Sequence, residues 1–200
     1  MYSQSIIRKQ KEDTMNPKVK LRLRIIAILT TLIWMIVIFR FSMDTGASSH
    51  ELSDMCVKIF NKAILCFTGK DLRIAISPQH YAFIELFFRK LAHMSIYLVL
   101  SINVMVVLFT FNLHMISRIA MSVLFCFLYA LTDEFHQLFV DGRGASFIDC
   151  LIDTSGAVLG VIVSLILYCI LYTIMTKYQK RKGIVSSIYT KEKNIQDTIV

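Results

Sequence analysis

The sequence predicts an all-α protein that crosses a membrane, with four transmembrane helices and an amphipathic helix in the long loop after the first span. Of its 200 residues, 56% are hydrophobic, above the roughly 45–50% of soluble domains, and the mean hydropathy is +0.60. The apolar residues occur in blocks long enough to cross a bilayer. The net charge of +8 is concentrated near the two ends of the chain. The basic residues flank apolar segments rather than forming a basic face, so nucleic-acid binding is not expected.

The first element is a basic arm, residues 1–20, followed by a predicted span over residues 21–41. This apolar run is longer than the 7–15-residue core of a signal peptide, and no small-residue cleavage motif follows it. We therefore expect it to be retained as the first transmembrane helix. Isolated cysteines in the chain form no Cys-x-x-Cys pair, so neither a zinc ribbon nor a thioredoxin-type site is predicted.

An amphipathic helix is predicted in the loop that follows this span. Apolar residues recur there at helical spacing, namely Leu52, Met55, Cys56, Ile59, Phe60, Ala63, Ile64 and Phe67. Ser49 is the expected N-cap and Gly69 the expected end, while Lys58, Asn61 and Lys62 lie off the apolar stripe. Because the helix is too charged to span, we expect it to lie on the membrane surface or over the bundle.

Three further spans are predicted, over residues 87–111, 118–132 and 147–173, which completes a transmembrane domain of residues 21–173. The last span contains Gly156 and Gly160 in a Gly-x-x-x-Gly pattern, which allows a neighbouring helix to approach closely. Residues 174–200 form a basic tail.

The charge distribution predicts which side of the membrane each loop faces. Four spans place both termini on the same side, and both terminal segments are rich in Lys and Arg. The positive-inside rule therefore predicts cytoplasmic termini. The long loop, the start of the second span, the end of the third and the start of the fourth then share the outer boundary.

Polar residues from three separate stretches are predicted to meet at that outer boundary. Such groups are costly in a membrane, which makes them a candidate functional site. The candidate residues are Arg89, Lys90, His93, Asp133, Glu134, His136, Gln137, Arg143, Asp149 and Asp153.

Helical spacing supports this grouping. Asp133 lies three and four residues before His136 and Gln137, so one helical face can present all three if the helix extends that far. Asp149 and Asp153 are four residues apart on the next helix. The turn between the two helices can bring Arg143, which glycines flank, back over the carboxylates.

These residue types fit more than one chemistry. The imidazole and carboxylate groups suit a divalent metal or acid–base catalysis, whereas Arg89, Lys90 and Arg143 suit a phosphate or carboxylate of a lipid-linked molecule or lipid headgroup. The sequence has no His-Glu-x-x-His motif and no Gly-x-Ser-x-Gly motif. Three functions stay open: an enzyme of the outer leaflet, a protein that binds or shields a headgroup without turnover, and a structural or partner-binding protein held by salt bridges.

Over roughly residues 25–170 the chain resembles the VanZ family of bacterial membrane proteins. Three stretches agree with the family in order and spacing, at residues 88–97, 132–143 and 149–156. One departure is Asp141, where the family usually has a proline before Gly-Arg. The resemblance implies a multi-pass protein of the bacterial plasma membrane, with a role in the cell envelope and in low-level resistance to the antibiotic teicoplanin.

Overall fold

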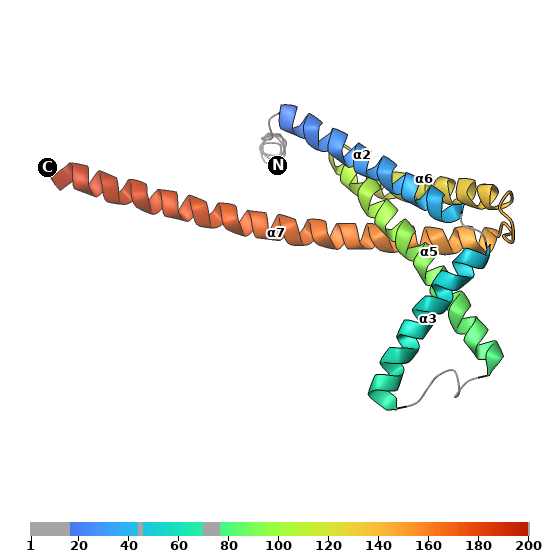
Figure 1. Cartoon of the computed structure of the whole chain (residues 1–200). Helices are drawn as coiled ribbons and strands as arrows, with labels where there is room; N and C mark the ends of the chain where they lie inside the picture. The colour runs from blue at the N-terminus through green and yellow to red at the C-terminus, as the bar shows by residue number, and fades with distance from the viewer. Residues whose placement is uncertain (1–16, 44–45, 70–76, 200) are drawn as a thin grey trace. The chain divides into compact units, whose positions relative to one another are not determined.

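The computed structural model describes residues 17–43, 46–69 and 77–199. Within these ranges every regular element is an α-helix (Figure 1). The helices are α2 (Pro17–Ser42), α3 (Gly46–Thr68), α5 (Pro78–Phe109), α6 (Met115–Gln137) and α7 (Phe147–Ile199). The predicted all-α fold is therefore confirmed.

Four of these helices are long and apolar enough to cross a membrane: α2, α5, α6 and the Phe147–Arg181 part of α7. Their outward faces carry many exposed leucine, isoleucine and phenylalanine side chains, as expected for helices surrounded by lipid. The chain divides into two units at Val161. The second unit is the continuation of α7 and is described only as a helix, and the packing and the site described below lie in the first unit.

Helix α5 is central, since α2, α3 and α6 all contact it. Trp34 of α2 donates its indole N–H to the carbonyl of Ile96 in α5 over 2.9 Å. Tyr129 of α6 donates its hydroxyl to the carbonyl of Met35 in α2 over 2.7 Å. Both polar groups find backbone partners inside an apolar bundle, where an unpaired group would be costly.

The core of the bundle combines apolar and small side chains. Its buried members are Ile38, Tyr97, Leu100, Val104, Leu108, Cys126, Ala130, Cys150 and Ala157. Small polar residues are buried as well, and Ser122 of α6 donates a long hydrogen bond of 3.4 Å to the carbonyl of Ser101 in α5. Small side chains at helix contacts let backbones approach, which favours association within a membrane.

The predicted close packing at the Gly-x-x-x-Gly pattern is confirmed. A Cβ atom placed on Gly156 would lie 2.1 Å from the carbonyl oxygen of Met94, and one on Gly160 would lie 2.1 Å from the Ser101 hydroxyl. Neither distance is compatible with a side chain. The start of α7 therefore lies against α5 at a separation that only glycine permits.

Helix α3 ends as predicted but begins earlier. Gly69 follows its last residue with φ of 68°, a conformation that glycine adopts without strain. The expected N-cap at Ser49 is wrong, because the helix begins at Gly46. The first turn of a helix has several N–H groups without a helical partner, and any nearby polar side chain can accept from them. A polar residue near the start of a helix therefore does not by itself identify the N-cap.

The face of α3 that packs on the bundle also differs from expectation. Val57 is fully buried, with Ser53 and Asn61 one turn to either side, so the buried face includes Asn61, which was predicted to lie off the apolar stripe. Met55, Ile59 and Phe67 of the apolar stripe are exposed. The small polar face therefore meets the protein, which leaves the apolar stripe available to lipid.

Basic side chains gather at the end of the bundle where α5 stops. Arg24 donates to the hydroxyl and the carbonyl of Thr110, and its guanidinium lies 4.1 Å from the ring centre of Phe111. Arg118 donates to the carbonyl of Phe111 over 2.9 Å. These contacts satisfy carbonyl groups near the C-terminus of α5, where positive charge is favourable.

Candidate functional site

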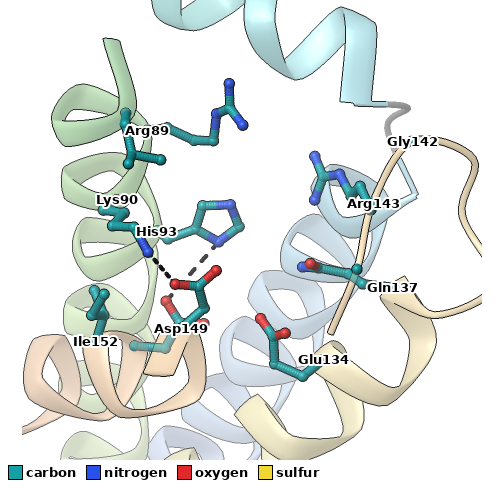
Figure 2. A pocket seen from close by; sticks show the side chains of 12 residues that line it. Arg89, Lys90, His93, Glu134, Gln137, Gly142, Arg143, Asp149 and Ile152 are labelled. Atoms are coloured by element: carbon teal, nitrogen blue, oxygen red, sulfur yellow. Dashed lines mark hydrogen bonds and ion pairs between the residues drawn. The ribbon is translucent and has the colours of Figure 1, made fainter. Parts of the chain in front are cut away.

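A pocket of about 160 Å³ opens where α5, α6 and α7 meet the turn between the last two helices (Figure 2). Eight of the ten predicted site residues line it: Arg89, Lys90, His93, Glu134, Gln137, Arg143, Asp149 and Asp153. Of the remaining two, Asp133 lies beside the pocket against His93 and Asp153, whereas His136 does not join it. Segments far apart in the sequence thus meet at one place.

Two ion pairs border the pocket. The ammonium of Lys90 on α5 binds the carboxylate of Asp149 on α7, and both side chains are partly exposed. Arg89 lies 3.6 Å from Glu85, one turn earlier on the same helix. Only the first pair joins two helices, so it contributes to holding the start of α7 against α5.

The inner part of the site is deeply buried. Asp153 is 1% exposed, and its Oδ1 lies 4.0 Å from Nδ1 of His93. This separation is too long for a hydrogen bond. Both carboxylate oxygens of Asp153 lack a hydrogen-bond partner among the described residues.

On α6, Asp133, Glu134 and Gln137 all face the interior, because the helix extends to Gln137 as the spacing required. The amide of Gln137 donates to Asp133 over 3.5 Å, at the limit of a hydrogen bond. Glu134 accepts a hydrogen bond of 2.7 Å from the backbone N–H of Ser146. Ser146 was not predicted, since its contact depends on how the turn folds back.

Arg143 is positioned by the turn between α6 and α7. The N–H of Arg143 donates to the carbonyl of Val140 over 3.2 Å, and Gly142 between them has φ of 75°. These are the features of a type II turn, which requires positive φ at its third residue. The turn directs the Arg143 guanidinium toward the pocket (Figure 2), as expected from the glycines that flank it.

His136 does not line this pocket, unlike Glu134 and Gln137 of the same helix. Its ring centre lies 4.6 Å from that of Phe39 of α2, with the two rings tilted at 48°, and His136 lines a second, mainly apolar hollow that Asp133 also lines. Spacing predicted that one face of α6 presents Asp133, His136 and Gln137. Asp133 and His136 do line one hollow, whereas Gln137 lines the pocket together with Glu134.

Leu86 and Ile152 also line the pocket, and sequence reasoning did not identify them. Leu86 precedes Lys90 by four residues and Ile152 follows Asp149 by three, so helical spacing from predicted residues would have found both. They add an apolar part to a lining that is otherwise polar and charged.

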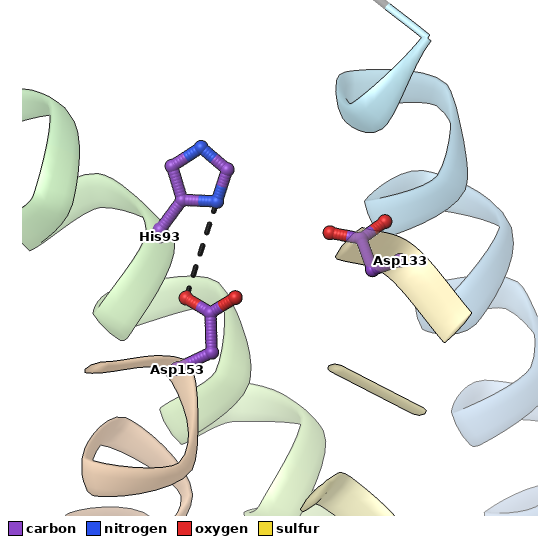
Figure 3. A group of neighbouring side chains, drawn as sticks. All are labelled: His93, Asp133 and Asp153. Carbon is purple, nitrogen blue, oxygen red and sulfur yellow. Dashed lines mark ion pairs between the residues drawn. The ribbon is translucent and has the colours of Figure 1, made fainter. Parts of the chain in front are cut away.

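The arrangement has two chemical capacities. Arg89, Lys90 and Arg143 come from α5 and the turn and can contact an anionic group from two sides. His93, Asp133 and Asp153 place one ligand atom each within 4.8 Å of one another (Figure 3), so these three residues could hold a metal ion.

Comparison with known proteins identifies the family. No curated protein and no solved structure matches the chain. A family model described as VanZ/LLP1 matches residues 27–187, a range that includes every residue lining the pocket. Since this match extends over most of the sequence, the chain belongs to the VanZ family.

Proposed function

We propose that this protein acts in the bacterial cell envelope, where its pocket binds the anionic headgroup of a lipid-linked or wall-precursor molecule and thereby gives low-level tolerance of teicoplanin. The observation that carries the proposal is the convergence of Arg89, Lys90 and Arg143 on one pocket at an end of the helical bundle. Charge-assisted hydrogen bonds from such groups recognise phosphate and carboxylate.

The location of the pocket supports a substrate that reaches it from the bilayer. It is formed by the end of α6, the start of α7 and the part of α5 between Leu86 and His93, and all three helices are of membrane-spanning length. We infer that it lies close to a lipid headgroup. Leu86 and Ile152 provide apolar contacts beside the charged groups, as an amphiphilic ligand requires.

The proposed orientation places the pocket outside the plasma membrane and both termini in the cytoplasm. The opposite end of the bundle supports it, because Lys20, Arg24 and Arg118 are held there around residues 110–112. Basic residues next to spans favour the cytoplasmic side.

A second candidate function is structural. The Lys90–Asp149 ion pair and the Glu134–Ser146 hydrogen bond each join two segments. On this alternative the polar cluster is a network that holds the helix ends together, and loss of any member lowers protein abundance rather than a specific activity.

The test is teicoplanin susceptibility of cells that express the protein at matched membrane levels. Variants Arg143→Ala, His93→Ala and Glu134→Gln are compared with wild type, and Arg40→Ala, an exposed arginine outside the pocket, is the matched control. The proposal expects protection by wild type and the control, with loss in the pocket variants. Equal protection by all variants would contradict the site, and no protection by wild type would contradict the phenotype.

The same cells distinguish turnover from binding. An enzyme leaves a modified lipid or wall precursor that mass spectrometry detects in extracts and that Glu134→Gln lacks. A binding protein leaves the extracts unchanged, and its protection rises in proportion to the amount of protein.

A further inference from the structure

We propose that His93, Asp133 and Asp153 form a binding site for one divalent transition-metal ion, of the Mn²⁺ or Zn²⁺ type, beside the pocket. This site goes beyond the proposed function, since Arg89, Lys90 and Arg143 can bind an anion without it. The proposal rests on geometry and on the lack of hydrogen-bond partners for buried groups.

The three residues come from three different helices. His93 belongs to α5, Asp133 to α6 and Asp153 to α7, and their ligand atoms all lie within 4.8 Å of one another (Figure 3). A shared ion would therefore join three helices at one point. It would add to the direct contacts that already hold α7 against α5.

An independent observation is the state of the Asp153 carboxylate. The side chain is 1% exposed, and neither oxygen has a hydrogen-bond partner among the described residues. Buried charges are normally paired or coordinated to metals, because removing them from water uncompensated is costly. The nearest recorded partner is His93, and at 4.0 Å it does not hydrogen-bond.

A second buried group points to the same place. The hydroxyl of Tyr97 is fully buried and has no hydrogen-bond partner among the described residues. Tyr97 lies one helical turn beyond His93 on α5, close enough to Asp133 and Asp153 to interact with both electrostatically. A hydrated ion in this space would bring water to such a group.

The donor set selects the class of ion. Ca²⁺ and Mg²⁺ prefer oxygen ligands throughout, whereas one imidazole with two carboxylates suits ions such as Zn²⁺ and Mn²⁺. Two carboxylates also match the charge of a divalent ion. Three protein ligands leave a position open, and His93 and Asp153 line the pocket, so a ligand oxygen could reach the ion.

The distances make a specific demand. Three ligand atoms that each lie about 2.1 Å from one tetrahedral ion are roughly 3.4 Å from one another. The His93–Asp153 separation is 4.0 Å and the outer limit for the group is 4.8 Å, so both exceed this spacing. Ion binding therefore requires the three side chains to move inward, each by up to roughly 1 Å.

The experiment measures metal bound to the purified full chain in detergent micelles. The protein is stripped with chelator and titrated with Mn²⁺, and the electron paramagnetic resonance signal of free aqueous Mn²⁺ reports what remains unbound. Zn²⁺ is then added as competitor. Asp153→Asn is the main variant because it keeps the shape of the side chain, and Asp141→Asn in the exposed turn is the matched control.

We expect one saturable Mn²⁺ per wild-type chain, displaced by Zn²⁺, with unchanged affinity in Asp141→Asn. Loss of a supporting residue already weakens metal sites about 10–100-fold, so Asp153→Asn, which removes a ligand, should weaken binding at least as much. His93→Gln should also remove the nitrogen coupling from the spectrum of bound Mn²⁺.

The unfolding temperature of the metal-free protein distinguishes a metal ligand from a purely structural role. If Asp153 is purely structural, Asp153→Asn should unfold at a lower temperature than wild type. If Asp153 binds metal, metal-free Asp153→Asn should unfold at the same or a higher temperature than metal-free wild type, because a buried unpaired charge is gone. Wild-type protein that binds neither Mn²⁺ nor Zn²⁺, or Asp153→Asn that binds as tightly as wild type, would overturn the proposal. Neither readout depends on teicoplanin, so the metal site and the proposed function can fail separately.

Discussion

Glu134 and Ser146 are joined by a hydrogen bond of 2.7 Å, in which the Ser146 backbone N–H donates to the Glu134 carboxylate. Glu134 is near the end of α6, and Ser146 immediately precedes the first residue of α7. N–H groups at the start of a helix have no partner within it. The contact therefore closes the turn that carries Arg143.

Replacing Glu134 with alanine should destabilise the protein. A hydrogen bond to a charged group contributes about 1.5–3 kcal/mol, and the variant also leaves the Ser146 N–H without its acceptor. Glu134→Gln retains an acceptor oxygen and should lose less. Thermal unfolding in detergent micelles measures both. A Glu134→Ala protein as stable as Glu134→Gln would show that this contact does not stabilise the fold.

Gly156→Ala should lower the free energy of unfolding by roughly 1–3 kcal/mol, the usual cost of forcing extra atoms into a packed interior. The added methyl would lie 2.1 Å from the carbonyl oxygen of Met94. Gly144→Ala is the matched control, because a Cβ there meets nothing within 4 Å. The idea fails if chemical denaturation gives both variants the same stability.

The type II turn predicts that substitutions at Asp141 and Gly142 change the stability of the protein in opposite directions. Asp141 occupies the second position of the type II turn, where proline is favoured, and its N–H donates no recorded backbone hydrogen bond. Asp141→Pro should therefore raise the free energy of unfolding by about 0.4–1 kcal/mol. Gly142→Ala should lower it by about 1–2 kcal/mol, since alanine is strained at positive φ. Thermal unfolding measures both changes in stability. An Asp141→Pro variant that is less stable than wild type would contradict the assigned turn type.

The Lys90–Asp149 ion pair offers a test between a binding and a structural role. Both side chains are partly exposed, so a double-mutant cycle with Lys90→Met and Asp149→Asn should give a coupling of only about 0.2–1 kcal/mol. A weak pair leaves Lys90 able to turn toward an anionic ligand. A coupling above about 3 kcal/mol, the range of buried pairs, would instead favour the structural alternative.

Membrane orientation can be tested with single cysteines. Cys56, Cys66 and Cys169, which are exposed, are first replaced by serine. Lys62→Cys on α3 should then react with an impermeant maleimide in intact cells, whereas Asn112→Cys should react only after permeabilisation, as the positive-inside rule predicts. The reverse pattern would place the pocket in the cytoplasm.

The sequence predicted the parts of this structure that depend on local order. Helical spacing placed Asp149 and Asp153 on one face, and Gly69 predicted the end of α3. Both predictions succeed because they depend only on residues that are close in the sequence. The face that α6 turns inward was not predictable, since it depends on tertiary packing. For that reason the sequence did not show that His136 lies with Asp133 in the second hollow, while Glu134 and Gln137 line the pocket.

The same limit applies to α3. Periodicity placed the apolar stripe correctly along the helix, but it could not show whether lipid or protein covers each face. In the structure Val57 and Asn61 meet the bundle, because small side chains permit a close helix contact. The Glu134–Ser146 contact likewise follows from the path of a turn and has no signature in composition.

The close contact of Gly156 and Gly160 with α5 determines how the pocket can admit a ligand. Met94 lies directly after His93, and Gly156 follows Asp153 by three residues, so His93 and Asp153 sit on a rigid wall that neither opens nor slides easily. The α5–α7 contact therefore keeps His93 and Asp153 in one mutual arrangement, so it fixes which charges a ligand meets when it enters the pocket.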